Sequence, residues 1–382
     1  MTQLGPLSDA RVCICVGAGG VGKTTTAAAL AVGAALRGLK VAVITIDPAP
    51  RLAQALALER LENQPIQIQL GQVEQRSTQA ERGELWAMRL DVQRTLDELV
   101  ALLLVDEQAR SELLENRVYR QLSNALAGSH EFSAVVKLHE LDQAQEYDVL
   151  VLDTPPSRSA LDLLDAPDRL TRFLDSRALE MLLGGTHLGA RVVGGTAGMM
   201  LRMLSRLTGA GMLDDAAAFL VALGDVRIGF KERAERVRQL LRDPATNFLL
   251  VTAAEPLPVR EAIFLGRKLR HEGMRLGGVV VNRVHHDGLD ELDVCELTEA
   301  LREDLDAALA ARVADTLAEY HDRAQRGEHE TNLLARALGL HGTIDVPELD
   351  QDVCDLEGLA YISRFLFADE RERTALMNGL VC

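Results

Sequence analysis

The residues from Gly17 to Thr24 have the types and spacing that most directly predict chemistry. They read Gly-Ala-Gly-Gly-Val-Gly-Lys-Thr and fit the pattern G-x-x-x-x-G-K-[ST] at every position. In such a loop, glycines let the backbone approach phosphate oxygens, the lysine reaches the β- and γ-phosphates, and the last hydroxyl ligates Mg²⁺. The sequence therefore predicts a site for a nucleoside triphosphate and Mg²⁺. The residues expected to hold the nucleotide here are Gly17, Gly19, Gly20, Val21, Gly22, Lys23, Thr24 and Thr25.

The segments beside this loop place it between a strand and a helix. Val12–Val16 is a short apolar segment of β type, and Thr25–Arg37 is rich in helix formers and precedes Gly38. A strand, a glycine loop and a helix N-terminus in this order direct backbone N–H groups and the helix dipole toward phosphates. The flanking segments therefore favour a phosphate-binding loop over an ordinary glycine-rich turn.

Two aspartates follow apolar runs of strand length and complete a candidate site. Asp153 follows Val-Leu-Val-Leu, and Asp47 follows Val-Ala-Val-Ile-Thr-Ile. Carboxylates at the carboxyl ends of parallel strands hold Mg²⁺ and the attacking water in enzymes with this loop. We therefore expect Thr24 and Asp153 to bind the metal, and Asp47 and Lys23 to act in catalysis. The alternative for both aspartates is a turn residue in front of proline.

Apolar runs of strand length alternate with helical stretches along the chain. Such runs indicate strands that helices cover on both faces, as in a parallel sheet. We expect an α/β fold of the P-loop NTPase class, with a mainly parallel β-sheet wound by helices and with helical insertions. The predicted organisation is a single domain over residues 1–382, helical insertions at about 92–145 and 165–243, and an acidic helical hairpin at about 289–338. The strand-like runs are Val41–Ile46, Leu85–Leu90, Val149–Leu152, Phe248–Thr252, Gly278–Asn282 and Thr343–Val346.

The composition excludes some classes of partner. The formal net charge of −16 argues against nucleic acid, because phosphate backbones bind basic surfaces. No apolar run approaches the roughly 18 to 20 residues that a membrane-spanning helix needs. We expect a cytoplasmic protein, with peripheral attachment at a membrane as the alternative. The five cysteines include no C-x-x-C pair, so we expect no structural zinc site.

With these motifs the chain resembles the arsenical-pump ATPase family, which includes the ATPase that guides tail-anchored proteins to membranes. The resemblance begins with the loop Gly17–Thr24 and the motifs Asp47-Pro48-Ala49 and Asp153-Thr154-x-Pro156. It implies an ATPase that uses ATP and Mg²⁺ and dimerises with two nucleotides facing each other. Three later segments extend the resemblance. Leu126–Glu131 is similar to the family's L-P-G-x-D-E segment. Val279–Asn282 is similar to the strand whose asparagine reads the adenine, and the stretch around Pro347 is similar to the loop that closes over the base.

The chain departs from the family pattern at Ala18. The family's loop usually reads G-K-G-G, and its first lysine reaches across the dimer to the partner's nucleotide. A methyl group cannot stabilise charge on a transferring phosphoryl group. Either Arg51 or Arg158 supplies the missing charge, or the chain forms a heterodimer with a related ATPase subunit that keeps the lysine. We favour the heterodimer.

Residues 181–213 combine eight glycines, five methionines and three arginines without any acid, inside an acidic protein. Glycine at this density weakens helices, whereas methionine side chains adapt to irregular apolar partners. In the tail-anchored targeting ATPase, the corresponding insertion covers a groove for a hydrophobic client. Two interpretations remain open: an element that faces a hydrophobic client or membrane protein, and a lid that packs on its own subunit.

The sequence leaves two functional hypotheses open. In the first, the chain is a Mg²⁺-dependent ATPase that couples ATP binding and hydrolysis to dimer opening and closing, and to the handling of a hydrophobic client or membrane partner. In the second, it is a nucleotide-binding regulatory subunit with weak hydrolysis of its own. That subunit would work in a heterodimer with a lysine-bearing paralogue.

Overall fold

The chain divides into two compact units, which are described here one at a time. The first comprises Met1–Arg89, Gln145–Ala160 and Arg242–Cys382, and the second Leu90–Ala144 and Leu161–Leu241. The expectation of one domain with two insertions and a hairpin stays a prediction. The computed structural model describes residues 5–71, 83–104, 106–117, 119–120, 129–154, 165, 167–168, 171–172, 175, 210–286, 294–349 and 351–379.

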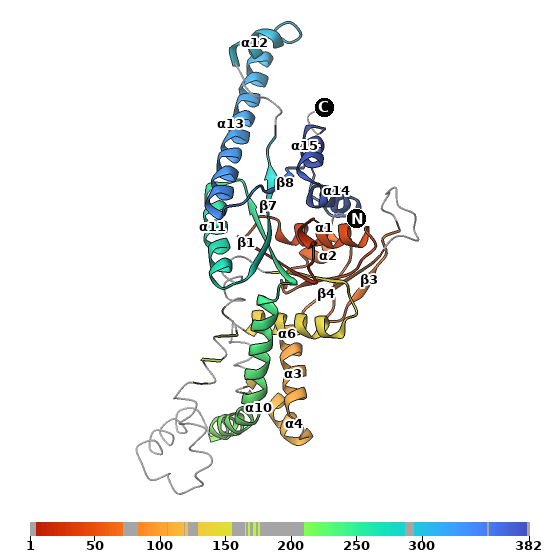
Figure 1. Cartoon of the computed structure of the whole chain (residues 1–382), viewed down its shortest axis with the longest axis vertical. Helices are drawn as coiled ribbons and strands as arrows, with labels where there is room; N and C mark the ends of the chain where they lie inside the picture. Colours follow the sequence, from red (N-terminus) through yellow and green to blue (C-terminus); the bar gives the residue numbers. More distant parts are fainter. Residues whose placement is uncertain are drawn as a thin grey trace, which may run out of the picture. The chain divides into compact units, whose positions relative to one another are not determined.

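Eight strands in the described residues form one sheet, which belongs to the first unit (Figure 1). Its strand order is β3-β4-β2-β5-β1-β6-β7-β8. All neighbours are parallel except β3, which runs antiparallel to β4. The expected α/β fold with a mainly parallel sheet is confirmed. The strands are β1 (Val12–Gly17), β2 (Lys40–Thr45), β3 (Ile66–Ile68), β4 (Glu84–Arg89), β5 (Val149–Asp153), β6 (Thr246–Ala253), β7 (Arg275–Val284) and β8 (Ile344–Pro347).

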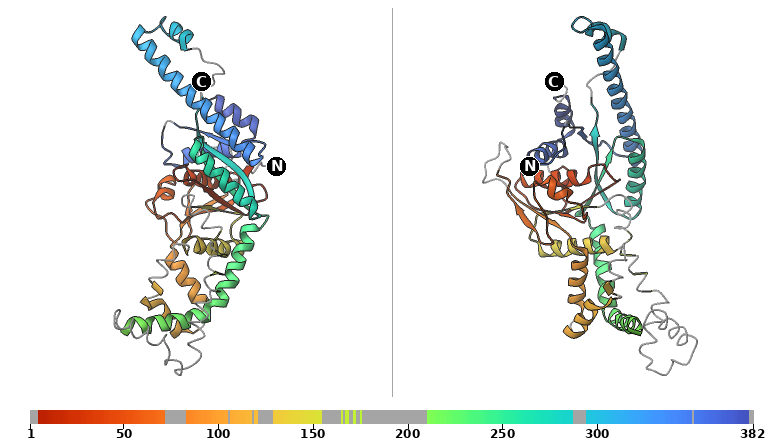
Figure 2. Two further views of the ribbon diagram at one scale, coloured as in Figure 1. Left: turned by 90° about the vertical axis from the view of Figure 1, so that its left-hand side faces the viewer. Right: turned by 180° about the vertical axis from the view of Figure 1, so that it is seen from behind.

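Helices cover both faces of this sheet, which explains its apolar strands. Every residue of β1, β5 and β6 is buried. Helices α1 and α14 lie on one side of the sheet and α11 and α13 on the other (Figure 2). The first unit contains a 3-10 turn (Gly5–Leu7) and the helices α1 (Lys23–Ala35), α2 (Arg51–Ala55), α11 (Pro256–His271), α12 (Val294–Leu301), α13 (Ala307–Leu338), α14 (Leu356–Phe367) and α15 (Glu370–Asn378).

The structure adds one strand that the sequence analysis did not anticipate and shortens one helix. Strand β3 has three residues, Ile-Gln-Ile, which is too short for a periodic pattern to reveal. Helix α1 ends at Ala35 and not at Arg37. The N–H groups of Arg37 and Gly38 bond to carbonyls three residues earlier, which tightens the last turn.

The second unit is helical in its described residues. It contains α3 (Val92–Leu103), α4 (Glu107–Glu115), α6 (Ser129–Ala144) and all but the last residue of α10 (Ala210–Arg242). Within the described residues of the whole chain, none of the helices combines the length and apolar character needed to cross a membrane. A small core joins α3, α4 and α10 through the buried side chains of Val100, Leu104, Leu113, Tyr119 and Val226.

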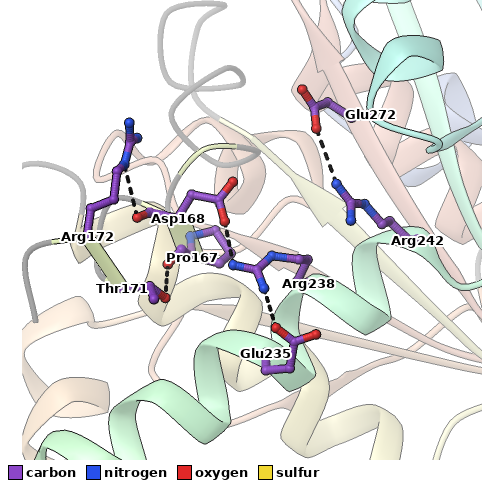
Figure 3. A network of polar contacts seen from close by, with 8 residues as sticks. All are labelled: Pro167, Asp168, Thr171, Arg172, Glu235, Arg238, Arg242 and Glu272. Atoms are coloured by element: carbon purple, nitrogen blue, oxygen red, sulfur yellow. Dashed lines mark hydrogen bonds and ion pairs between the residues drawn. The ribbon is translucent and has the colours of Figure 1, made fainter. Parts of the chain in front are cut away.

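Ion pairs join two aspartates of the second unit to α10. Asp168 pairs with Arg238, which also pairs with Glu235 on its own helix (Figure 3). The second aspartate, Asp175, pairs with Lys231 of the same helix. Because these groups are partly exposed, each pair contributes little stability alone.

A glycine in α1 gives a stability prediction. Alanine at Gly33 would gain about 1 kcal/mol of helix propensity. Its Cβ, however, would lie 2.6 Å from Cβ of Ser363 and 2.5 Å from Cε2 of Phe367, both on α14. Such overlap typically costs about 1 to 3 kcal/mol. The difference leaves a net loss, and we expect Gly33→Ala to lower the free energy of unfolding by up to about 2 kcal/mol in urea titrations.

The matched control is Gly342→Ala, because a Cβ there would meet nothing within 4 Å. We expect this variant to stay within about 0.5 kcal/mol of the parental protein. A stabilised Gly33→Ala protein would show that α14 moves away from α1 at little cost.

Candidate functional site

Two glycines fix the course of the loop between β1 and α1. A Cβ on Gly17 would lie 2.0 Å from the carbonyl oxygen of Val251 on β6, so only glycine permits this close approach. Gly22 precedes α1 with a φ of 88°, and its Cβ would lie 2.2 Å from Nδ2 of Asn282. Gly19 and Gly20 are exposed between these two anchors. The loop therefore presents its middle to solvent while its ends are held against the sheet.

The side chain of Lys23 folds back onto the loop. It is 6% exposed, and its Nζ donates a hydrogen bond of 2.6 Å to the carbonyl oxygen of Ala18. Burial lowers the pKa of Lys23, while the carboxylate of Asp153 acts in the opposite direction. Ala18 is itself buried. The ammonium group of Lys23 is thus buried within the loop, next to the predicted phosphate site.

Asp153 is a fully buried carboxylate, and only one of its oxygens has hydrogen-bond partners among the described residues. The hydroxyls of Thr24 and Thr45 both donate to Oδ2, each at 2.9 Å. Oδ1 is buried and has no hydrogen-bond partner among the described residues. Burial raises the pKa of Asp153 to about 6, although the two hydroxyls and Lys23 oppose this shift. An orphaned carboxylate oxygen beside the hydroxyl of Thr24 is a donor set that suits Mg²⁺ and its water ligands.

Asp47 lies at the end of β2, where its backbone and side chain are both held. Its N–H donates to the hydroxyl of Thr45 at 3.2 Å. Its Oδ1 accepts from the N–H of Ala49 at 3.0 Å, and its Oδ2 lies 3.8 Å from a guanidinium nitrogen of Arg51. The bond to Ala49 is one that a turn aspartate makes. The catalytic role and the turn role of Asp47 both remain compatible with this geometry.

The residues that we expect to contact the nucleotide's base, Asn282 and Pro347, lie on β7 and β8. Nδ2 of Asn282, on β7, donates to the carbonyl oxygen of Val21 at 2.9 Å. Because a carbonyl can only accept, this bond fixes the orientation of the amide and leaves Oδ1 of Asn282 as an acceptor. Pro347 ends β8 and is aligned with Val284 of β7. Thr25 lies in the first turn of α1.

Some sequence predictions fall outside the described residues. These are Arg158, residues 126–128 of the Leu126–Glu131 motif, and residues 181–209 of the glycine- and methionine-rich segment. Arg51, the other candidate for the missing charge, has 61% of its side chain exposed and lies close to Asp47.

Sequence reasoning did not anticipate the contacts of two threonines. Thr45 lies inside an apolar strand pattern, where a β-branched residue is common and does not indicate a functional role. Thr154 follows Asp153, and its hydroxyl donates at 2.6 Å to the carbonyl oxygen of Cys15, which ties the end of β5 to β1. A threonine at the end of a strand that carries a functional carboxylate is the signal that could have identified both.

Comparisons with known proteins show which sequences the chain is similar to. A family model described as anion-transporting ATPase matches residues 10–322. The chain is 28% identical over 275 residues to ATPase ARSA2 of Chlamydomonas reinhardtii, covering 70% of this chain and 66% of that protein. It is 26% identical over 276 residues to ATPase GET3A of Arabidopsis thaliana, covering 72% and 67%. A putative arsenical pump-driving ATPase of Halobacterium salinarum is 30% identical over 187 residues, covering 46% and 27%.

The alignments leave a large part of these relatives uncovered. Across the first four curated relatives, the chain spans between 36% and 67% of their lengths. The similarity therefore supports a shared family, while the activity and partners of the whole protein have to be argued from this chain's own residues.

The buried carboxylate gives a prediction for the metal-free protein. Because the pKa of Asp153 is about 6 in the folded state and about 4 when unfolded, the folded protein binds the additional proton between these values. The contribution of Asp153 to the free energy of unfolding must therefore fall as the pH rises through this window. Asp153→Asn removes the buried charge. We expect this variant to gain about 1 to 3 kcal/mol over the parental protein between pH 4 and pH 7.

The measurement is urea unfolding in EDTA at several pH values. The exposed Asp304 provides the control, because Asp304→Asn should follow the parental protein at every pH. If Asp153→Asn also follows the parental pH dependence, the carboxylate of Asp153 is better solvated than its burial indicates.

Proposed function

Because this chain belongs to the anion-transporting ATPase family, we propose that it binds ATP together with Mg²⁺ at the loop Gly17–Thr24 and hydrolyses the terminal phosphate. One observation carries the proposal. The buried carboxylate of Asp153 keeps Oδ1 without a partner among the described residues, beside the hydroxyl of Thr24 and close to the cation of Lys23. A buried acceptor without a partner destabilises the fold, and a bound cation would offset this cost.

The proposed roles follow from these contacts. Lys23 exchanges the carbonyl of Ala18 for the β- and γ-phosphates, which are stronger acceptors for its ammonium group. Thr24 and Asp153 hold Mg²⁺, which supplies positive charge to the phosphate oxygens when it is bound. Asp47 orients the attacking water at the end of β2.

Asn282 explains why the nucleotide would be ATP. Its amide nitrogen has two N–H donors and gives one of them to the carbonyl of Val21, so the acceptor Oδ1 and the second N–H are both available to a base. The six-position of adenine carries an amino donor, whereas that of guanine carries an oxygen acceptor. An amide that offers one donor and one acceptor matches the amino group and the neighbouring ring nitrogen of adenine, whereas guanine presents two acceptors at these positions. The amide therefore favours adenine, and we propose that Pro347 borders the same base.

We further propose that hydrolysis is coupled to opening and closing of a dimer. Dimers are typical of this family. The composition of residues 181–213 supports a hydrophobic client or membrane protein as the partner, because methionines and arginines without acids suit an apolar or anionic surface. A cytoplasmic location, with peripheral attachment at a membrane as the alternative, completes this proposal.

Ala18 favours a second candidate function. Its side chain is a buried methyl group, and its carbonyl is already the acceptor for Lys23. A homodimer would bring no cation across the interface from this position. The chain would then be a nucleotide-binding subunit with weak hydrolysis of its own, completed in trans by the lysine of a related ATPase subunit.

Two substitutions test the site. Lys23→Ala removes the cation for the phosphates and should abolish ATP binding or hydrolysis.

Asp47→Asn should leave Mg-ATP binding within about threefold and slow turnover by about 10²-fold or more, because water activation is lost. Asparagine can still accept from the N–H of Ala49, so the turn is preserved. Single-turnover hydrolysis and nucleotide titration measure the two effects, and a parental rate in Asp47→Asn would make Asp47 a turn residue.

Ala18→Lys separates the two candidate functions. If the chain depends on a partner's lysine, the isolated parental protein should bind Mg-ATP tightly but turn over slowly. Ala18→Lys should then raise turnover by at least about 10-fold, given that trans-acting cations contribute roughly 10³ to 10⁵ elsewhere. The control is Ala18→Met, which adds a long side chain without charge. Rapid turnover by the parental homodimer, unchanged in Ala18→Lys, would rule out the heterodimer.

A further inference from the structure

Thr45, the last residue of β2, connects the two aspartates of the proposed site. Its side chain is 1% exposed. Its hydroxyl oxygen lies 3.2 Å from the backbone nitrogen of Asp47 and 2.9 Å from Oδ2 of Asp153. The residue aligned with Thr45 across the β2–β5 ladder is Asp153 itself. One buried hydroxyl thus touches the backbone of one carboxylate residue and the carboxylate of the other.

The direction of both hydrogen bonds is determined by chemistry alone. A backbone N–H can only donate, so the oxygen of Thr45 accepts from Asp47. The single hydroxyl proton of Thr45 is then given to Asp153, whose ionised carboxylate can only accept. The chain therefore runs from the N–H of Asp47 through Thr45 to Oδ2 of Asp153. Each bond in such a chain polarises the next, so a change at Asp153 alters the bond at Asp47.

Packing alone does not account for this hydroxyl. Val41 and Val43 precede Thr45 on the same face of β2, and both are fully buried, so valine would suit the packing at this position. Thr246 on β6 is equally buried, yet its hydroxyl has no partner among the described residues. The sheet thus contains a buried threonine whose hydroxyl bonds nothing described, whereas the hydroxyl of Thr45 is used twice.

We propose that Thr45 is a positioning residue that couples the carboxylate of Asp153 to the backbone of Asp47. The inference rests on the proposed function, in which Asp153 holds the metal and Asp47 orients the water. Together with Thr24, Thr45 occupies Oδ2 and so leaves Oδ1 for the metal and its water ligands. Arrival of the nucleotide and its metal at Asp153 then strengthens or weakens the bond that holds Asp47 at the end of β2.

The test compares Thr45→Val, which keeps the shape and removes the hydroxyl, with Thr45→Ser, which keeps the hydroxyl. Thr246→Val is the matched control for the loss of a buried hydroxyl elsewhere in the sheet. Two-dimensional ¹⁵N NMR of the labelled full chain reports the amides of Asp47 and Gly22, first without metal or nucleotide and then with Mg-ADP. Steady-state kinetics with Mg-ATP gives kcat and KM for the same proteins.

Without metal, we expect the Asp47 amide to exchange with solvent at least about 10-fold faster in Thr45→Val, and at the parental rate in Thr45→Ser and Thr246→Val. With Mg-ADP, the Asp47 resonance should shift in the parental protein and in Thr45→Ser but not in Thr45→Val. We expect kcat of Thr45→Val to fall by about 10- to 100-fold with KM within about threefold, and serine to restore it.

The outcomes separate this inference from the proposed function. If the Gly22 amide of the parental protein does not respond to Mg-ADP, the loop binds no nucleotide and the proposed function fails. The metal-free exchange still decides whether Thr45 holds Asp47. If Gly22 responds and the Asp47 shift is the same in Thr45→Val, the site binds nucleotide but the coupling through Thr45 is overturned. An equal loss of the shift in Thr246→Val would also overturn it.

Discussion

The burial of one carboxylate, that of Asp153, is the constraint on which the rest of the site depends. A charge in the core is costly unless hydrogen bonds or an opposite charge compensate it. Two hydroxyls and the nearby ammonium of Lys23 provide part of this compensation, and they all come from segments distant in sequence. No described residue bonds Oδ1, and this is why the ligand that we propose for the site is one that brings positive charge.

The order of the strands makes this arrangement possible. Strand β5 lies between β1 and β2, so its last residue is aligned with Cys15 on one side and with Thr45 on the other. In a parallel sheet, all three strands end at the same edge, where the phosphate loop also begins. The last residue of β5 therefore meets the loop, the helix that follows it and the end of β2, which are the three places from which its partners come.

Close contacts with the sheet give the loop its fixed ends. Gly17 touches the backbone of β6, and Gly22 touches Asn282 of β7. The same asparagine holds the carbonyl of Val21, so the residue that would read the base also supports the loop that would hold the phosphates. Recognition of the base and binding of the phosphates are for this reason expected to depend on each other.

The sequence by itself determined the local features of this protein, because they depend on neighbours along the chain. The phosphate loop, the apolar strands and the aspartates at strand ends all follow from short patterns, and with them the α/β class. Only the tertiary structure decided which of these ends meet. Thr24 lies 129 residues from Asp153 in sequence, Thr45 lies 108 residues from it, and Asn282 lies 261 residues from Val21. The partners of a buried polar group are chosen by strand order and register, which no local pattern records.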